Sequence, residues 1–289
     1  MSEPKSAPTV LAIVLGRRLA ALRDAAGLTA AQAAKHLRIV ATTITRMEKA
    51  ETSLKYATAK TLLEIYGVSQ AEIEEFLSLL DKASTPGWWQ SFRDVLPTWF
   101  GVHVSLETAA THIRSFEPAV PPGLLQTPEY ARAVLERGLP HISPDVLERR
   151  VALRTARQEL LTRTDPQPPQ LWAVLDETVL RRPAGSSDVM RGQIDHLLDM
   201  AGLPNVTLQV CPFAAGLHPA AFGPFTIFRF EIPELPDIVC TDSLSRASYG
   251  EGKDEVALFR EALGEMSVYA LSKDDTKQFL GDIRKELYP

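Results

Sequence analysis

The stretch that decides the fold is Leu28–Ala50, LTAAQAAKHLRIVATTITRMEKA. Its apolar positions fall where two short helices pack face to face across a tight turn, and these positions are Ala34, Leu37, Ile44 and Met47. The outward face of the second helix carries hydroxyls and cations, namely Thr42, Thr43, Arg46 and Lys49. In the major groove of double-stranded DNA, arginine pairs with guanine, and threonine meets a base edge or a thymine methyl. The stretch therefore predicts a helix-turn-helix that binds DNA, and a helical protein-interaction module is the alternative.

The sequence around this stretch keeps helical spacing and, over residues 9–82, contains no proline. Leucines at that spacing run from Leu11 to Leu22, and Gly27 follows as a residue suited to end a helix. Thr29 is placed to cap the second helix and Ser69 to cap the fifth. The pattern breaks at residues 84–92, STPGWWQSF, where we expect an arm that packs on the following domain. The sequence predicts an all-α five-helix domain over residues 1–83.

Charge divides the chain at the same place. The formal net charge of −5 argues against DNA binding if it is evenly spread. Between Arg17 and Lys60, however, nine basic residues stand against three acidic ones, whereas from Ser84 onward 20 stand against 27. A small basic segment on an acidic body is typical of a binding module joined to another domain. The predicted DNA contacts are Thr29, Lys35, Arg38, Thr42, Thr43, Arg46 and Lys49.

The rest of the chain mixes two patterns. Helical spacing marks residues 106–117, 127–138, 144–161, 188–202 and 254–272. Short apolar runs rich in β-branched and aromatic residues predict strands at 170–176, 206–213, 225–230 and 237–242. This alternation predicts a mixed α/β domain over residues 84–289, and the whole chain is then an α+β multidomain protein.

The sequence offers little catalytic chemistry. It has no GxSxG, HExxH, GxGxxG or phosphate-loop motif, so we expect neither an enzyme nor a bound cofactor. Cys211 and Cys240 are too few for a disulfide framework and predict packed, reduced thiols. Asp195, His196 and Asp199 lie close in a predicted helix, but a solvated face explains them better than a metal site. With no membrane-length apolar run and no secretory leader, we expect a cytoplasmic protein.

The N-terminal residues resemble the Xre/Cro-type, lambda-repressor-like helix-turn-helix family. The resemblance rests on Gly16-Arg-Arg-Leu, Gly27-Leu-Thr and Ile44-Thr-Arg-Met. It implies a salt bridge between Arg23 and Glu48 that ties the first helix to the recognition helix. It also implies base contacts from the positions of Ala41, Thr42 and Arg46.

This sequence departs from the family pattern at four positions. Ala30 replaces a glutamine, Arg38 the turn glycine, Val40 a serine or threonine, and Ala41 a polar base reader. The departures leave the packing positions intact and deplete the reading face. We therefore expect DNA preference to rest on Arg46, Thr42 and the basic rim, although a phosphate contact is the alternative for Arg46.

A second resemblance covers nearly everything from Trp88 onward. Its markers are EPAVPPGLLQTPEYARA (117–133), RTARQELL (154–161), VLDETVLRR (174–182), NVTLQVCPFAAGLHPAAFGPFTIFRF (205–230) and YALSKDDT (269–276). Together they resemble the large C-terminal domain of unknown function joined to Xre-type domains in actinobacterial regulators of development and antibiotic production. The resemblance implies a domain that dimerises, senses a ligand or holds a small partner protein encoded nearby, in an antitoxin-like arrangement.

The residues of these segments can also be interpreted without the family resemblance. Thr127 and Pro128 are placed to start a helix, so a structural role is favoured there over a ligand-binding loop. Phe213, His218 and Phe222 lie in an irregular loop between two strands, and either line a pocket or pack internally.

Three functional hypotheses remain. The first is a dimeric, sequence-specific transcriptional regulator. The second is an antitoxin-like partner-sequestering protein with autoregulatory DNA binding. The third is an effector sensor.

Overall fold

The computed structural model describes residues 9–83, 87–232, 235–243 and 247–289. The chain divides into two compact units. The first unit comprises Met1–Arg93, Pro97–Leu106 and Ile232–Leu235, and the second comprises Asp94–Leu96, Glu107–Glu231 and Pro236–Pro289. No helix of the described residues is both long enough and apolar enough to cross a bilayer.

The first unit begins with five helices, as the sequence predicts. They are α1 (Val10–Ala25), α2 (Ala30–Leu37), α3 (Ala41–Glu48), α4 (Tyr56–Ile65) and α5 (Gln70–Ala83). Two of the boundaries are set by glycines with positive φ, +70° at Gly27 and +73° at Gly67, a conformation in which any side chain is strained. The Thr29 hydroxyl accepts a hydrogen bond from the Gln32 amide, and the Gln32 side chain accepts one from the Thr29 amide. This reciprocal cap fixes the start of α2.

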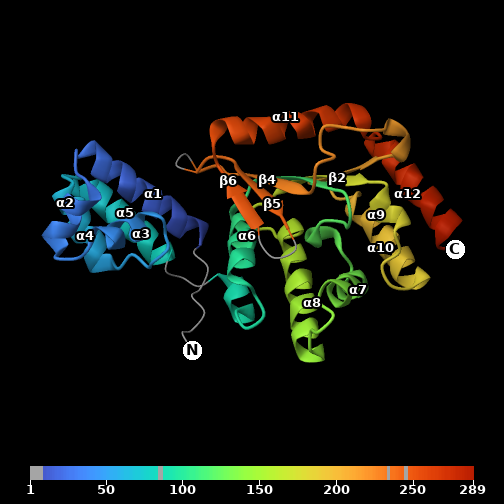
Figure 1. The fold of residues 1–289 in the computed structure, drawn as a ribbon, viewed down its shortest axis with the longest axis horizontal. Helices are drawn as coiled ribbons and strands as arrows, with labels where there is room; N and C mark the ends of the chain where they lie inside the picture. The colour runs from blue at the N-terminus through green and yellow to red at the C-terminus, as the bar shows by residue number, and fades with distance from the viewer. Residues whose placement is uncertain (1–8, 84–86, 233–234, 244–246) are drawn as a thin grey trace. The chain divides into compact units, whose positions relative to one another are not determined.

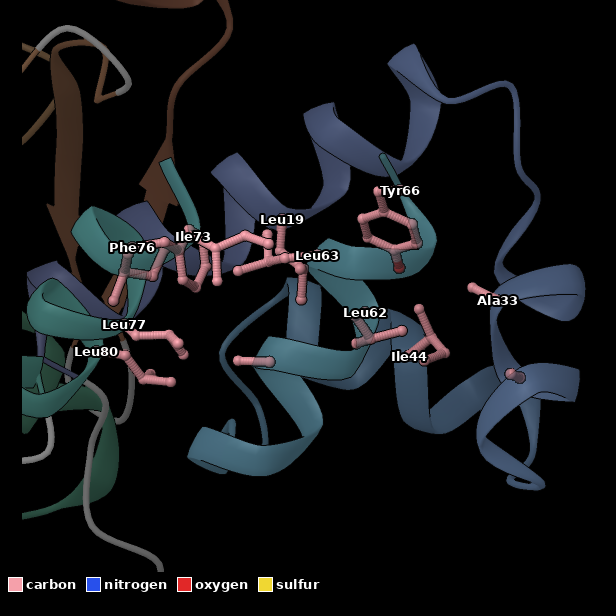
Figure 2. Packing of buried hydrophobic residues seen from close by; sticks show 13 residues of the cluster. Leu19, Ala33, Ile44, Leu62, Leu63, Tyr66, Ile73, Phe76, Leu77 and Leu80 are labelled. Carbon is pink, nitrogen blue, oxygen red and sulfur yellow. The ribbon is translucent and has the colours of Figure 1, made fainter. Parts of the chain in front are cut away.

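The core of this unit lies where the five helices meet. Figure 2 shows its buried side chains converging from α1, α2, α3, α4 and α5. Leu19, Ile44 and Leu62 are each fully buried, and Phe76 of α5 is 1% exposed. Ile44 stands on the inner face of α3, so this burial turns the opposite face of that helix outward.

The tryptophan pair lies in the 3-10 helix η1 (Trp88–Phe92). Its rings meet edge to face, 6.2 Å apart, and Trp89 is 5% exposed whereas Trp88 is 39% exposed. This segment belongs to the first unit, whereas the sequence suggested an arm packed on the following domain.

The second unit is built on a mixed six-stranded sheet with the order β3-β2-β1-β4-β5-β6. Its strands are β1 (His112–Glu117), β2 (Gln170–Asp176), β3 (Val206–Cys211), β4 (Phe225–Arg229), β5 (Ile238–Asp242) and β6 (Ala247–Gly250). β1, β2 and β3 pair in parallel, and β4, β5 and β6 continue the sheet antiparallel from β1. The two parallel connections are made by helices, as parallel pairing requires.

Helices cover this sheet. They are α7 (Pro128–Gly138), α8 (Pro144–Gln158), α9 (Thr178–Arg181), α10 (Ser187–Met200), α11 (Lys253–Tyr269) and α12 (Lys273–Leu287), with short turns η2 (Gly123–Leu125), η3 (Glu159–Leu161) and η4 (Phe213–Ala215). Figure 1 shows α11 along one side of the sheet and α8 on the other. Val256, Leu263 and Met266 of α11 are buried against Phe116 and Val174. The fold is therefore all-α in its first part and mixed α/β in its second.

One predicted element is wrong. Residues 106–117 were expected to form a helix, but α6 (Thr98–Ala109) ends early and β1 begins at His112. Ile113 and Phe116 are spaced for a helix face, but β1 is hydrogen-bonded to β2 on one side and to β4 on the other, and both side chains are buried on the sheet. Pairing within the sheet outweighs the local pattern. The four strands expected from the sequence are all present.

Candidate DNA interface

The α2–α3 pair is held in a helix-turn-helix by an unusual turn residue. Arg38 follows α2 with φ 56° and ψ 40°, the left-handed conformation that glycine adopts more easily. The Ile39 amide then donates to the Ala34 carbonyl at 3.1 Å, closing the end of α2. Val40 precedes α3 without a side-chain cap. The turn before α3 thus presents an exposed cation, Arg38, and an exposed apolar side chain, Val40.

The outward face of α3 presents the residues that the sequence singles out. Thr42, Arg46 and Lys49 are exposed, and Thr43 is half-buried. Arg46 Nε lies 3.8 Å from Glu51 Oε2, and both side chains are about half exposed. Such an exposed pair contributes little and yields readily to a stronger anion. The guanidinium of Arg46 is therefore accessible to a base or a phosphate.

The predicted contacts on α2 divide into two kinds. Lys35 and Arg38 are exposed cations beside α3. The Thr29 hydroxyl is already bonded to the Gln32 amide and side chain, so it serves first as a helix cap. Among the residues that the structure describes, no carboxylate forms an ion pair with Lys35, Arg38 or Lys49. The rim of this face carries uncompensated positive charge.

Arg23 and Glu48 fasten α1 to the end of α3. Arg23 Nε donates to Glu48 Oε1 at 2.6 Å and its NH2 group donates to Oε2 at 3.2 Å, a two-point ion pair with side chains 13% and 8% exposed. The NH1 group of Arg23 also donates to the Leu28 carbonyl at 2.8 Å, which adds the segment before α2. The hydrogen bond to Glu48 raises the pKa of Arg23 above its usual value. Burial, followed by the charge of Glu48, raises the pKa of Tyr66 to about 12.

A close backbone approach supports the same junction. A Cβ atom at Gly16 would overlap the Glu48 carbonyl oxygen and would lie 3.0 Å from the Met47 carbonyl oxygen. Only glycine lets α1 approach the end of α3 this closely. In the sequence, Gly16 lies within a predicted helix, where glycine is unfavourable. This unfavourable choice was the one sign in the sequence that another segment packs closely there.

Two large apolar side chains of the helix-turn-helix region are exposed, Val40, which the sequence placed on the reading face, and Tyr56, which the sequence did not single out. Val40 precedes α3 and is 66% exposed, and Tyr56 opens α4 and is 59% exposed. Tyr56 directly follows Lys55, and Val40 lies two residues after Arg38. An apolar side chain of this kind suits a thymine methyl, and a tyrosine hydroxyl suits a phosphate.

The loop residues of the second unit do not come together in one enclosed site. His218 is 7% exposed and packs edge-on against Phe116 at 5.0 Å. Phe213 and Phe222, by contrast, are 56% and 95% exposed. The loop is anchored by Glu177, whose carboxylate accepts from the Phe213 amide at 2.7 Å. His218 therefore supports the loop, and the two phenylalanines face solvent.

A helix-turn-helix with an intact core and a cationic outer face is typical of DNA-binding proteins, and one family comparison agrees. Residues 14–76 match the family model described as Helix-turn-helix domain. Residues 100–282 match the model described as Domain of unknown function (DUF5753). Because this match spans more than half of the 289 residues, the chain belongs to that family. No curated protein and no solved structure matches the chain. The helix-turn-helix points to a DNA-binding regulator rather than an enzyme.

Proposed function

We propose that this protein is a sequence-specific transcriptional regulator of the Xre type that inserts α3 into the major groove. The observation that carries the proposal is the division of α3 into two faces. Ile44 is fully buried in the core, whereas Thr42, Arg46 and Lys49 are exposed on the opposite side. A short helix presented in this way by a rigid scaffold matches the geometry of a recognition helix.

The contacts divide into reading and positioning roles. Arg46 reads a base edge, with guanine as its best partner, and Thr42 contacts a neighbouring base. Lys35, Arg38 and Lys49 contact phosphates, because they surround the reading residues and have no acidic partner among the described residues. The ion pair of Arg23 with Glu48 keeps α3 at a fixed angle to α1.

Binding of the full chain to duplexes from the region upstream of its own gene tests this function by fluorescence anisotropy. Arg46→Ala should weaken specific binding by about 1–3 kcal/mol. The matched control is Arg132→Ala on α7, a half-buried arginine paired with Glu148 at 2.7 Å, which should leave binding unchanged. Absence of binding at low salt, or equal binding by the Arg46→Ala protein, would contradict the proposal.

The proposed regulator acts as a homodimer in the cytoplasm. One helix-turn-helix covers only a half-site, and two recognition helices about 34 Å apart give the affinity that specific sites require. The second unit offers exposed apolar side chains for a contact between copies at Phe213, Leu217 and Phe222, which are 56%, 83% and 95% exposed. Light scattering at binding concentrations should give the mass of two chains. A monomer both free and on DNA would refute this point.

A further inference from the structure

Helix α8 carries three arginines on one face, and only one of them is neutralised. They stand at positions 150, 154 and 157, spaced four and three residues apart. The Nε and NH2 groups of Arg157 donate to the two carboxylate oxygens of Glu107 at 2.8 and 2.7 Å, and both side chains are 4% exposed. The positive charge of Arg157 is therefore balanced by a carboxylate inside the second unit, and Arg154 and Arg150 can be compared with it.

Arg154 meets no such partner. Its NH1 group donates to the amide oxygen of Gln126 at 2.5 Å, and the Gln126 amide nitrogen donates in turn to the Pro121 carbonyl at 2.8 Å. Within the described part of the chain, no carboxylate pairs with Arg154. Burial, and then the charges of Arg157 and Arg150, lower the pKa of Arg154 to about 10. A neutral amide leaves this cation uncompensated, which is unfavourable away from water.

Arg150, one helical turn earlier, also has no carboxylate partner among the described residues. Its Nε atom is buried and has no hydrogen-bond partner among the described residues. Like charges four residues apart on a helix repel, so Arg150 and Arg154 each make the other less favourable. Packing of the described residues thus leaves two neighbouring cations on one helix face without a carboxylate, and one of them, Arg150, with a buried donor that has no partner.

A third cation without a carboxylate partner in the described chain, Arg182, and the phenol of Tyr130 come from other elements. Arg182 directly follows α9, is exposed, and forms no ion pair with any described residue. The positive charges of Arg154 and Arg182 both lower the pKa of the Tyr130 phenol of α7, against the larger effect of its burial. Burial raises the pKa of Tyr130 to about 12, which keeps its O–H group a donor at neutral pH. Donors from α7, α8 and the residue after α9 thus interact electrostatically with one another within the second unit.

We propose that Arg150, Arg154, Arg182 and Tyr130 bind a small anion that carries a carboxylate or a phosphate group. The planar guanidinium fork matches the two oxygens of either group, and an anion supplies the negative charge that would balance these arginines. The segments 117–133, 154–161 and 174–182 contribute Tyr130, Arg154 and Arg182. This site gives those segments a ligand-binding role that does not depend on DNA binding.

Calorimetric titration of the full chain tests the site, with inorganic phosphate in one arm and succinate in the other, each at constant ionic strength set by chloride. We expect saturable binding in at least one arm, and the arm that binds identifies the anionic group. Arg154→Gln should raise the Kd about tenfold or more, since it removes a charge-assisted hydrogen bond. Arg182→Gln should weaken it as well, and Arg149→Gln, an exposed arginine paired with Asp94 at 2.7 Å, should not.

Two results would overturn the assignment. One is the absence of saturable heat in both arms for the unmodified chain. The other is equal affinity in the unmodified chain and the Arg182→Gln variant, which remains decisive if Arg154→Gln does not fold, because Arg182 is exposed. Neither result bears on DNA binding, since no DNA enters the experiment.

Discussion

Replacement of Gly16 by alanine tests how tightly α1 is packed against the end of α3. The added Cβ atom would overlap the Glu48 carbonyl oxygen and lie 3.0 Å from both the Glu48 carbonyl carbon and the Met47 carbonyl oxygen. All three atoms belong to the backbone, so no side chain can move aside. The two helices must separate, and this separation also stretches the ion pair of Arg23 with Glu48.

The size of the effect follows from two opposing contributions. Overpacking of a close contact costs about 1–3 kcal/mol, and rigid backbone on both sides places this site near the upper end. Alanine in a helix interior returns about 1 kcal/mol relative to glycine. The net expectation is a loss of about 2 kcal/mol in the free energy of unfolding of the first unit, which corresponds to a change of about thirtyfold in the opening equilibrium.

Hydrogen–deuterium exchange read by mass spectrometry is the suitable assay, because it resolves α1 and α3 from the second unit. Gly16→Ala should speed exchange in both helices and leave α11 unchanged. The matched control is Gly264→Ala, since apart from the adjacent helix backbone no atom of the described residues lies within 4 Å of its added Cβ, and alanine should slow exchange in α11. Exchange in α1 and α3 as slow as in the unmodified chain would refute the close packing.

Three further predictions concern single residues. Glu48→Ala removes the buried two-point partner of Arg23, leaves it only the exposed carboxylate of Asp24, and should lower the free energy of unfolding by about 2–3 kcal/mol, measured in urea; an unchanged midpoint would contradict the role of the pair. Arg38→Gly should stabilise the chain by about 0.5–1 kcal/mol because it removes a left-handed non-glycine residue, yet should reduce the salt dependence of DNA binding by about 0.9 in slope. Unchanged salt dependence would exclude a phosphate contact. Burial and the nearby Asp242 raise the pKa of Glu117 to about 8, so the native chain holds a proton that the unfolded chain releases near pH 4.5. Its contribution to stability is therefore present below about pH 4.5 and is lost as the pH rises toward 8, and Glu117→Gln should flatten this part of the stability profile; an unchanged slope would contradict the shift.

The sequence is most informative where local chemistry decides structure. Thr29 with Gln32, and the glycines that end α1 and α4, mark helix boundaries because each cap is satisfied within a few residues. The four predicted strands are recognisable because apolar, β-branched runs end at proline, glycine or aspartate. The five-helix first part and the mixed second part of the fold follow from these signals.

The remaining features depend on contacts between distant segments. The strand at His112 is fixed by partners 58 and more residues away, Gln170 being one, and its spacing also fits a helix. α12 was not predicted, although Thr276, Leu280 and Ile283 are spaced for one buried helix face. The pairing of Arg157 with Glu107, 50 residues apart, has no local signature. In the DNA-binding region, the cations could be identified from the sequence alone. The exposure of Val40 and Tyr56 depends on how the helices pack and is known only from the structure.

Methylation interference at guanine N7 tests the central claim most directly, because that atom lies in the major groove where Arg46 is placed to bind. A duplex that the full chain binds is methylated at random, and bound and free fractions are compared. The account predicts that methylation of specific guanines blocks the unmodified chain, and that the Arg46→Ala protein loses sensitivity at one of them in each half-site. Binding that is indifferent to guanine methylation, or interference that is identical for both proteins, would contradict the placement of α3 in the major groove.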